Sequence, residues 1–398
     1  MKVQFTWGGT SFALDDGVLT PYREELERLG RTPPVRLVYA AAHLVMREEY
    51  AQVNHSLDTP VAPQEIAPYI DWESTLSLRK RLGQLGFGIA EAMDTAQRFQ
   101  IGWDNAQHLI ECTGALRLKN GFIAGAGVDH LESIESEDDL VAGVIYQARL
   151  IQAAGGTVIL LPLIWLPQNG LLEDDYVRIY GRIIEGLSGP LFIHWLGEMF
   201  LPELAGYFPG KSFSRIMALD AHKLRGAKLS LLDADFERRL RRELLTRDQI
   251  MLTGDDFNFG ELMVGGTGDR QTELAGRSVP LGDFSHGLLG IFDAIFEPAS
   301  CALRFLAHGN EAKFTELMTP CEVLGRHLFE NPTRHYKAGL AFLSYLNGAQ
   351  TNPMLVQHEE RARDIQHYFE AARLASLAGG IKDATLAASR LGKLAADR

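Results

Sequence analysis

The sequence has few cysteines and no excess of positive charge. Its 398 residues contain three cysteines, Cys112, Cys301 and Cys321, and no CxxC pair. This spacing excludes a disulfide framework and a local zinc ribbon, and it favours a reducing compartment. Lysine and arginine number 39 against 51 aspartates and glutamates, which gives a formal net charge of -12. We therefore expect no nucleic-acid partner, because such binding draws on clustered basic side chains.

Long apolar runs are missing as well. No stretch approaches the roughly 18 to 20 consecutive apolar residues of a membrane span. The first residues, MKVQFTWGGTSFALDDG, lack the uninterrupted apolar run of a signal peptide. We therefore expect a cytoplasmic protein with no membrane partner.

Short apolar runs alternate with amphipathic helical stretches along most of the chain. A content of 46% hydrophobic residues suffices for a large core, and the alternation is typical of βα units around a parallel sheet. The eight predicted strands are Val35 to Ala42, Gly86 to Ala92, Gly121 to Ala126, Thr157 to Ile164, Pro190 to Trp195, Arg225 to Ser230, Gln249 to Thr253 and His286 to Ile291. Eight units predict an α/β fold of the (β/α)8 type, a TIM barrel, with its reactive site at the carboxyl ends of the strands.

The chain after the eighth predicted strand is helical. Helices are predicted near Pro298 to Gly309, Ala312 to Leu328, Thr333 to Leu346, His358 to Leu377 and Lys382 to Ala396. We expect residues 1–297 to form the barrel with an N-terminal extension, and residues 298–398 to form a C-terminal helical region. Two stretches, Arg47 to Tyr69 and Gly265 to Gly282, fit no minimal unit and are either lids or ordinary surface insertions. Appended helices often pair between copies, so we expect a homodimer or homotetramer.

The sixth predicted strand carries a lysine. Strand alternation places Gly226, Lys228 and Ser230 on one face and Ala227 and Leu229 on the other. The second face is the apolar one that helices cover, so Lys228 is expected to point into the barrel. Dehydration lowers the pKa of an amine and makes it a nucleophile that forms a Schiff base with a carbonyl substrate. The alternative is a structural lysine that reaches the rim or pairs with a carboxylate.

Polar side chains follow other predicted strands. His194, at the end of the fifth, is either a general acid or base or a structural ring held by a backbone carbonyl. Asp255 and Asp256 follow the seventh, where one is expected to face the mouth of the barrel and the other to cap the next helix. Asp94 and Thr95 follow the second, as substrate-binding groups or as helix caps.

A divalent metal site is an alternative use of the same mouth. The nitrogen and oxygen ligands of a sugar-isomerase type of centre would come from His43, Glu91, His194, Asp255 and His286. No HxH or HExxH spacing supports this set. The leading hypothesis therefore needs no cofactor, and a divalent metal is the alternative.

These segments resemble a known superfamily. The stretch RGAKLSLLDADFE (Arg225 to Glu237), followed by LTGDDF (Leu252 to Phe257), resembles the Gly-x-Lys strand and the Ser-Gly-Asp-Asp turn of the dihydrodipicolinate synthase and N-acetylneuraminate lyase superfamily. Weaker similarities lie in GIAEAMDTAQ (Gly88 to Gln97), GFIAGAG (Gly121 to Gly127), PLFIHWLG (Pro190 to Gly197) and FENPTRHYK (Phe329 to Lys337). The resemblance implies a TIM barrel with a small helical C-terminal domain, class I aldolase chemistry, and Lys228 as the Schiff-base lysine.

Departures from the superfamily narrow the expected substrate. His194 stands where the superfamily has a tyrosine that assists proton transfer, and Glu198 stands where it has a carboxylate-binding arginine. Ile164 and Trp165 stand where it has a tyrosine pair, and its threonine pair is reduced here to Asp94 and Thr95. A hydroxyl relay is therefore expected to be missing and the clamp for an acidic substrate to be weak. Dihydrodipicolinate synthesis itself is therefore disfavoured.

The leading hypothesis is a Schiff-base aldolase or lyase acting on a keto acid or a sugar-derived keto compound. Lys228 would condense with the carbonyl group and His194 would move the proton. Substrate hydroxyls would be oriented by Asp94, Thr95, Glu198, Asp255, Asp256 and His286. The alternatives are a metal-dependent sugar isomerase or epimerase, and a barrel that binds a metabolite without catalysis.

Overall fold

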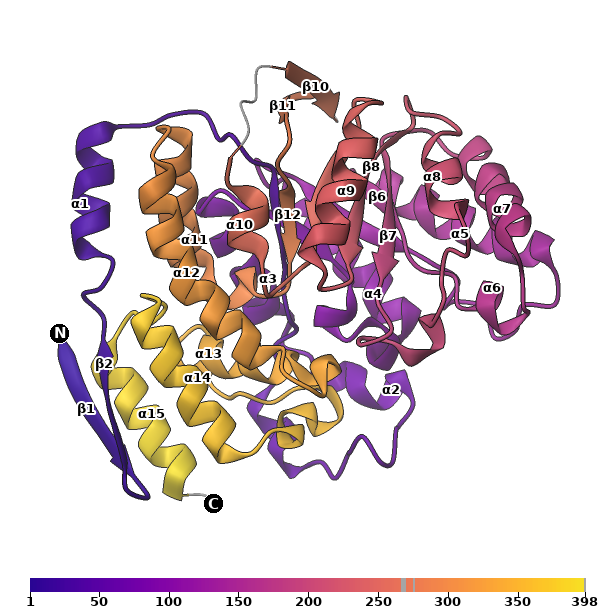
Figure 1. The fold of residues 1–398 in the computed structure, drawn as a ribbon. Helices are drawn as coiled ribbons and strands as arrows, with labels where there is room; N and C mark the ends of the chain where they lie inside the picture. Colours follow the sequence, from indigo (N-terminus) through magenta and orange to yellow (C-terminus); the bar gives the residue numbers. More distant parts are fainter. Residues whose placement is uncertain (266–269, 275, 397–398) are drawn as a thin grey trace.

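The computed structural model describes residues 1–265, 270–274 and 276–396, and it contains a closed barrel of parallel strands (Figure 1). The barrel strands are β3 (Val38–Ala41), β4 (Gly88–Glu91), β5 (Phe122–Ala126), β6 (Thr157–Leu160), β7 (Leu191–Leu196), β8 (Leu224–Ser230), β9 (Ile250–Thr253) and β12 (His286–Leu289). They are neighbours in this order, and β12 closes the barrel by pairing with β3 and β9. The TIM barrel is confirmed, and every predicted strand overlaps an observed one.

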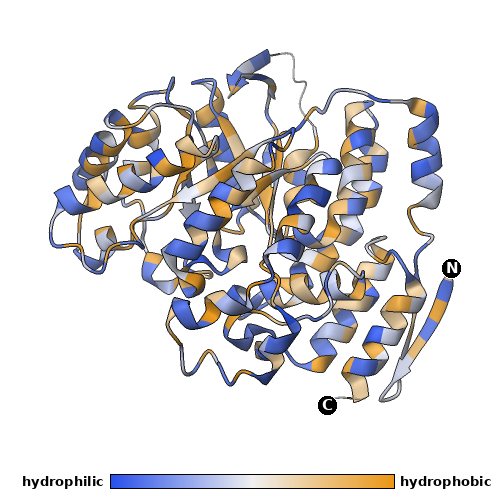
Figure 2. Ribbon diagram, turned by 180° about the vertical axis from the view of Figure 1, so that it is seen from behind, coloured by the Kyte–Doolittle hydropathy of each residue, from blue (hydrophilic) through white to orange (hydrophobic). Residues whose placement is uncertain are grey.

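Helices cover the outside of the barrel. They are α2 (Pro63–Ile66), α3 (Trp72–Gln84), α4 (Arg98–Ala115), α5 (Glu137–Ala153), α6 (Trp165–Gln168), α7 (Glu173–Glu185), α8 (Ser212–Met217), α9 (Ala234–Leu245) and α10 (Phe259–Met263). Side-chain caps fix where some of them begin: the Asp71 carboxylate accepts a hydrogen bond at the start of α3, and the Ser136 hydroxyl does so for α5. Figure 2 shows apolar residues concentrated in the strands, whereas the helices also carry polar residues.

A hairpin closes the floor of the barrel, at the amino-terminal ends of the strands. It consists of β10 (Arg270–Leu274) and β11 (Arg277–Leu281). Its buried side chains Leu274, Val279 and Leu281 join one apolar cluster with Tyr39, Ile123 and Phe192 of the barrel interior. The described part of the stretch 265–282 is therefore a plug at the floor and not a lid at the mouth, because it directly precedes a barrel strand. Residues 266–269 and 275 of this stretch lie outside the described residues.

The C-terminal helices pack beside the mouth, together with the N-terminus. They are α11 (Phe292–Ala307), α12 (Glu311–Leu328), α13 (Lys337–Leu346), α14 (Ile365–Leu377) and α15 (Ala384–Ala396). The N-terminal hairpin, β1 (Lys2–Trp7) and β2 (Thr10–Asp15), places the rings of Phe5 and Trp7 5.2 and 4.9 Å from that of Phe369 on α14. The N-terminal hairpin thus lies beside the last two helices, α14 and α15 (Figure 1).

Helices connect the barrel, the N-terminal extension and the C-terminal helical region. Helix α11 runs through the boundary expected at residues 297 and 298, so the division into two regions stays a prediction. α1 (Thr20–Leu29) packs against α11, which ties the N-terminal extension to the later helices. Within the described ranges, every helix is too short or too polar to cross a bilayer.

Candidate active site at the mouth of the barrel

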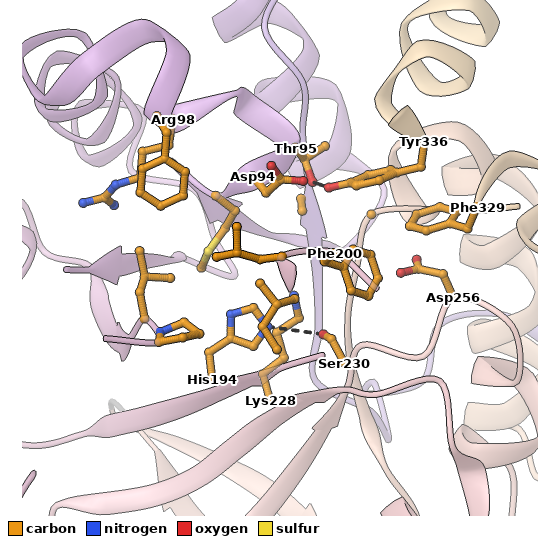
Figure 3. A pocket seen from close by; sticks show the side chains of 18 of the residues that line it. Asp94, Thr95, Arg98, His194, Phe200, Lys228, Ser230, Asp256, Phe329 and Tyr336 are labelled. Atoms are coloured by element: carbon orange, nitrogen blue, oxygen red, sulfur yellow. Dashed lines mark hydrogen bonds between the residues drawn. The ribbon is translucent and has the colours of Figure 1, made fainter. Parts of the chain in front are cut away.

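A cavity opens at the carboxyl ends of the strands (Figure 3). Its polar lining residues are Asp94, Thr95, Arg98, His194, Lys228, Ser230, Asp256 and Tyr336. Much of the remaining wall is apolar and includes Met93, Leu161, Ile164, Leu196, Phe200, Leu201 and Phe329. The structure thus brings together five of the predicted site residues: Asp94, Thr95, His194, Lys228 and Asp256.

Lys228 points from β8 into this cavity (Figure 3). It is partly accessible because it faces the cavity, although it lies deep within the barrel. Burial lowers the pKa of Lys228 to about 8, while the carboxylates of Asp256 and Asp94 favour its charged form. Across the described residues, no hydrogen bond or ion pair holds the amine. The arrangement differs from the structural alternative, in which a carboxylate locks the lysine.

Two glycines near Lys228 serve different purposes. A Cβ at Gly254 would lie 2.7 Å from Lys228 Cε and 2.2 Å from Ser230 Oγ, so the lysine side chain needs glycine at this position. A Cβ at Gly226 would lie 2.9 Å from the Phe192 ring. The Phe192 ring therefore occupies the space beside Gly226. The room for the Lys228 side chain is left by Gly254, which directly follows the neighbouring strand β9.

His194 is the neighbour of Lys228 in the paired strands β7 and β8. Its side chain is buried, with Nε2 3.3 Å from Ser230 Oγ, and its Nδ1 has no hydrogen-bond partner within the described part of the chain. Burial, followed by the charge of Lys228, holds the pKa of His194 well below its usual range. A neutral imidazole that no backbone carbonyl holds is available as a proton acceptor.

Asp255 and Asp256 divide the two roles expected of them. One Asp255 oxygen accepts hydrogen bonds from two backbone N–H groups of the following turn, at 2.9 and 3.0 Å, so this residue is structural. Asp256 lines the cavity, and one of its oxygens accepts a hydrogen bond from the Ile291 N–H at 2.9 Å. Burial raises the pKa of Asp256 to about 7, although the Ile291 N–H and Lys228 favour the carboxylate. Asp256 and Lys228 therefore have similar proton affinities.

The C-terminal helical region supplies a tyrosine that sequence analysis missed. Tyr336 directly precedes α13, is 4% exposed, and places its hydroxyl 2.7 Å from Thr95 Oγ1. Burial and then the Asp94 carboxylate raise the pKa of Tyr336 well above its ordinary value, which keeps the hydroxyl protonated. The structure thus has a pair of hydroxyls at the cavity where none was expected. The only signal was the similarity of segment 329–337 to the superfamily.

Asp94 lies beside Thr95 on the short 3-10 helix η3 (Asp94–Ala96). Its carboxylate is 3.1 Å from Lys337 Nζ, and the same ammonium is 3.4 Å from Glu359 Oε1. Burial alone would lower the pKa of Lys337, but Asp94 and Glu359 outweigh it and raise this pKa. The buried ammonium group of Lys337 therefore lies within ion-pair distance of two carboxylates.

Other predicted site residues lie away from the cavity. Glu198 is exposed and is not part of the lining. His286 is the first residue of β12, and its Nδ1 accepts a hydrogen bond from Leu37 N at 2.8 Å at the barrel floor. This corrects the expectation of a substrate contact, because the first residue of a parallel strand lies opposite the mouth.

The residues of the alternative metal site do not converge. Each ring nitrogen of His43 has a hydrogen-bond partner, Asp293 for one and Gln350 for the other, and Glu91 forms a buried ion pair with Arg79 at 2.6 Å. Asp255 and His286 are engaged as described above. Among the described residues, the grouping with metal-ligand spacing is a different one, formed by His327, Glu330 and His367 in the C-terminal region.

Solved structures share this fold at low sequence identity. The dihydrodipicolinate synthase from Bacillus clausii is 13% identical, with a TM-score of 0.60 over 86% of this chain and 98% of that one. YagE, an E. coli K12 prophage protein of the dihydrodipicolinic acid synthase family in complex with pyruvate, is 11% identical, with a TM-score of 0.57 over 85% and 98%. N-acetylneuraminate lyase from Mycoplasma synoviae is 10% identical, with a TM-score of 0.56 over 88% and 99%. Identities this low establish the fold alone.

Comparison by sequence finds a family model but no curated relative. A search of curated proteins finds no match to the chain. A family model described as "Protein of unknown function (DUF993)" matches residues 16–397. Because this match spans nearly the whole sequence, the chain belongs to that family.

Proposed function

We propose that the protein is a Schiff-base (class I) aldolase or lyase in which Lys228 attacks the carbonyl group of a keto acid or a sugar-derived keto compound. The observation that carries the proposal is a buried amine with a pKa of about 8 that faces a cavity and has no ion-pair partner in the described structure. Such an amine is uncharged often enough near neutral pH to act as a nucleophile. The fold shared with lyases and with a pyruvate complex supports it.

The neighbouring groups suit the proton transfers of condensation. Lys228 Nζ forms a bond to the carbonyl carbon, and the carbonyl oxygen leaves as water. The Asp256 carboxylate would first take the extra proton from the ammonium group and later return it to the departing hydroxyl, since their pKa values of about 7 and about 8 are close. The product is an iminium bond that withdraws electrons from the neighbouring carbon.

Carbon–carbon cleavage would follow in the same cavity. The bond between the carbon next to the imine and the hydroxylated carbon beyond it breaks, and its electron pair forms an enamine. The hydroxyl proton of the leaving carbonyl fragment would pass to the neutral ring of His194. Protonation of the enamine carbon and addition of water then release the second product and restore Lys228. The hydroxyls of Thr95 and Tyr336 would orient the substrate oxygens.

Trapping of the imine tests this function. The protein is incubated with candidate keto acids and keto sugars in the presence of cyanoborohydride, and peptide mass analysis locates the reduced adduct. We expect the adduct on Lys228, with a yield that rises as the pH passes through about 8 and the ammonium group loses its proton. Lys228→Met should abolish it, and Lys211→Met, a change at an exposed lysine, should not. Turnover of a substrate with Lys228 unmodified would defeat the proposal.

The expected homodimer or homotetramer is part of the same proposal and stays a prediction. Sedimentation velocity of the full-length chain would decide it.

A further inference from the structure

We infer that the carbonyl compound bound in this cavity is uncharged and hydroxylated, and that the cavity discriminates against carboxylates. The inference rests on the proposed Schiff-base function, because it concerns the compound that Lys228 would capture. It follows from the charges that face the cavity and from the partners that these charges already have.

Apart from Lys228 itself, the described lining of the cavity offers no unpaired cation to a substrate carboxylate. Arg98 is the other basic residue of the lining besides Lys228. Its guanidinium forms two hydrogen bonds with the Asp129 carboxylate, at 2.9 and 2.8 Å, and donates further hydrogen bonds to Gly125 O and Gln147 Oε1. Arg98 is therefore neutralised and saturated. Lys228 itself forms the covalent bond to the substrate, and the Asp256 carboxylate already interacts with the charge of Lys228.

Two carboxyl groups face the cavity. The Asp94 carboxylate, whose side chain is 43% exposed, forms an ion pair with Lys337, and Lys337 is shared with Glu359, which also contacts His335 Nδ1 at 2.9 Å. Asp256 adds a second carboxyl group to the lining, and both aspartates are labelled in Figure 3. A substrate carboxylate next to the captured carbonyl would lie near both acidic groups, and like charges repel.

The same groups are suited to hydroxyls. Asp94 and Asp256 accept hydrogen bonds, and Thr95, Ser230 and Tyr336 both donate and accept them. The aromatic rings of Phe329 and Tyr336, stacked with centroids 4.2 Å apart, both line the cavity and add apolar surface to its wall. Acceptors beside apolar surface match the hydroxyl groups and the C–H groups of a keto sugar.

Two small ketones isolate the effect of charge. Hydroxyacetone and pyruvate differ only in that a hydroxymethyl group replaces the carboxylate beside the carbonyl. The full-length protein is given each at equal concentration with cyanoborohydride, and the initial rate of adduct formation on Lys228 is measured by mass analysis. The rate with a lysine amide in the same solution corrects for the intrinsic reactivity of each ketone. We expect the corrected ratio to favour hydroxyacetone by about tenfold or more.

Variants test whether Asp94 causes the preference. Asp94→Asn should lower the ratio several-fold, because it removes a carboxylate and leaves Lys337 with only Glu359. Asp174→Asn, at a carboxylate on α7 whose side chain is 88% exposed, should leave it unchanged. A corrected ratio at or below one, or equal shifts in both variants, would overturn the inference and leave the Schiff-base function standing. No adduct with these ketones or with a panel of keto sugars would instead overturn the proposed function.

Discussion

Lys228→Met is expected to make the protein more stable at neutral pH. The lowering of the Lys228 pKa from 10.5 to about 8 corresponds to about 3 kcal/mol against the charged amine in the fold. Methionine has a similar length and no charge, so the substitution removes this cost. A natural sequence that keeps a destabilising group at a cavity is consistent with a chemical role for that group.

The gain depends on pH in a defined direction. The pKa of Lys228 is lower in the folded than in the unfolded state, so the cost is fully present below about pH 8 and disappears as the pH approaches 10.5, where both states hold a neutral amine. Urea unfolding of both proteins should show a difference of up to about 3 kcal/mol at pH 7 and of less than about 1 kcal/mol at pH 10. A variant less stable than the wild type at pH 7, or a difference independent of pH, would refute the reasoning.

Lys337→Met is the matched control, because Lys337 is a second buried lysine beside the same cavity. Its pKa is raised by Asp94 and Glu359 against the effect of burial, so its charge stabilises the fold at neutral pH. Removing it leaves two carboxylates without their ammonium group, and we expect a loss of about 3 to 5 kcal/mol at pH 7. If the two substitutions change the free energy of unfolding in opposite directions, the cause is electrostatic, because an apolar side chain alone would change it in the same direction in both.

The remaining predictions concern the chemistry of the cavity. Tyr336→Phe should lower product formation about a hundredfold while imine trapping persists, since only the hydroxyl paired with Thr95 is lost; equal loss of both would contradict this. Gly254→Ala should reduce trapping about tenfold or more by displacing Lys228, whereas Gly392→Ala, where a Cβ meets nothing within 4 Å, should have no effect. Dialysis against EDTA should leave trapping unchanged; a loss restored by zinc would favour the metal-dependent alternative.

The barrel was predictable because its strands are buried on both faces. Such strands appear in the sequence as short apolar runs between amphipathic helices. Capping residues mark where such helices begin, as Ser136 does for α5. The position of a polar residue along the barrel axis was harder to predict. His286 was assigned to the mouth, and the stretch before it was predicted as either a lid or a surface insertion, but chain direction places the start of every parallel strand at the floor.

The candidate site was predictable only where local pattern determines it. Strand alternation was enough to direct Lys228 inward, and the turn after β9 presents one aspartate to the cavity while the other caps it. The contact between Thr95 and Tyr336 joins residues 241 positions apart, and no periodicity encodes such a contact. The helix near Tyr336 was predicted, but which of its residues would face the barrel was not.

The C-terminal helices are therefore part of the site and not only an attachment to the barrel. Tyr336 and Lys337 are consecutive, and they reach two consecutive residues of the barrel, because one contacts Thr95 and the other contacts Asp94. If the start of α13 moved, the hydroxyl pair and the ion pair would be lost together. The strand that carries Lys228 provides the reactive amine, whereas the residues that set the charge and hydrogen bonding opposite it depend on packing between barrel and helices. Substrate preference in this family should accordingly change with the segment before α13 more than with the barrel strands.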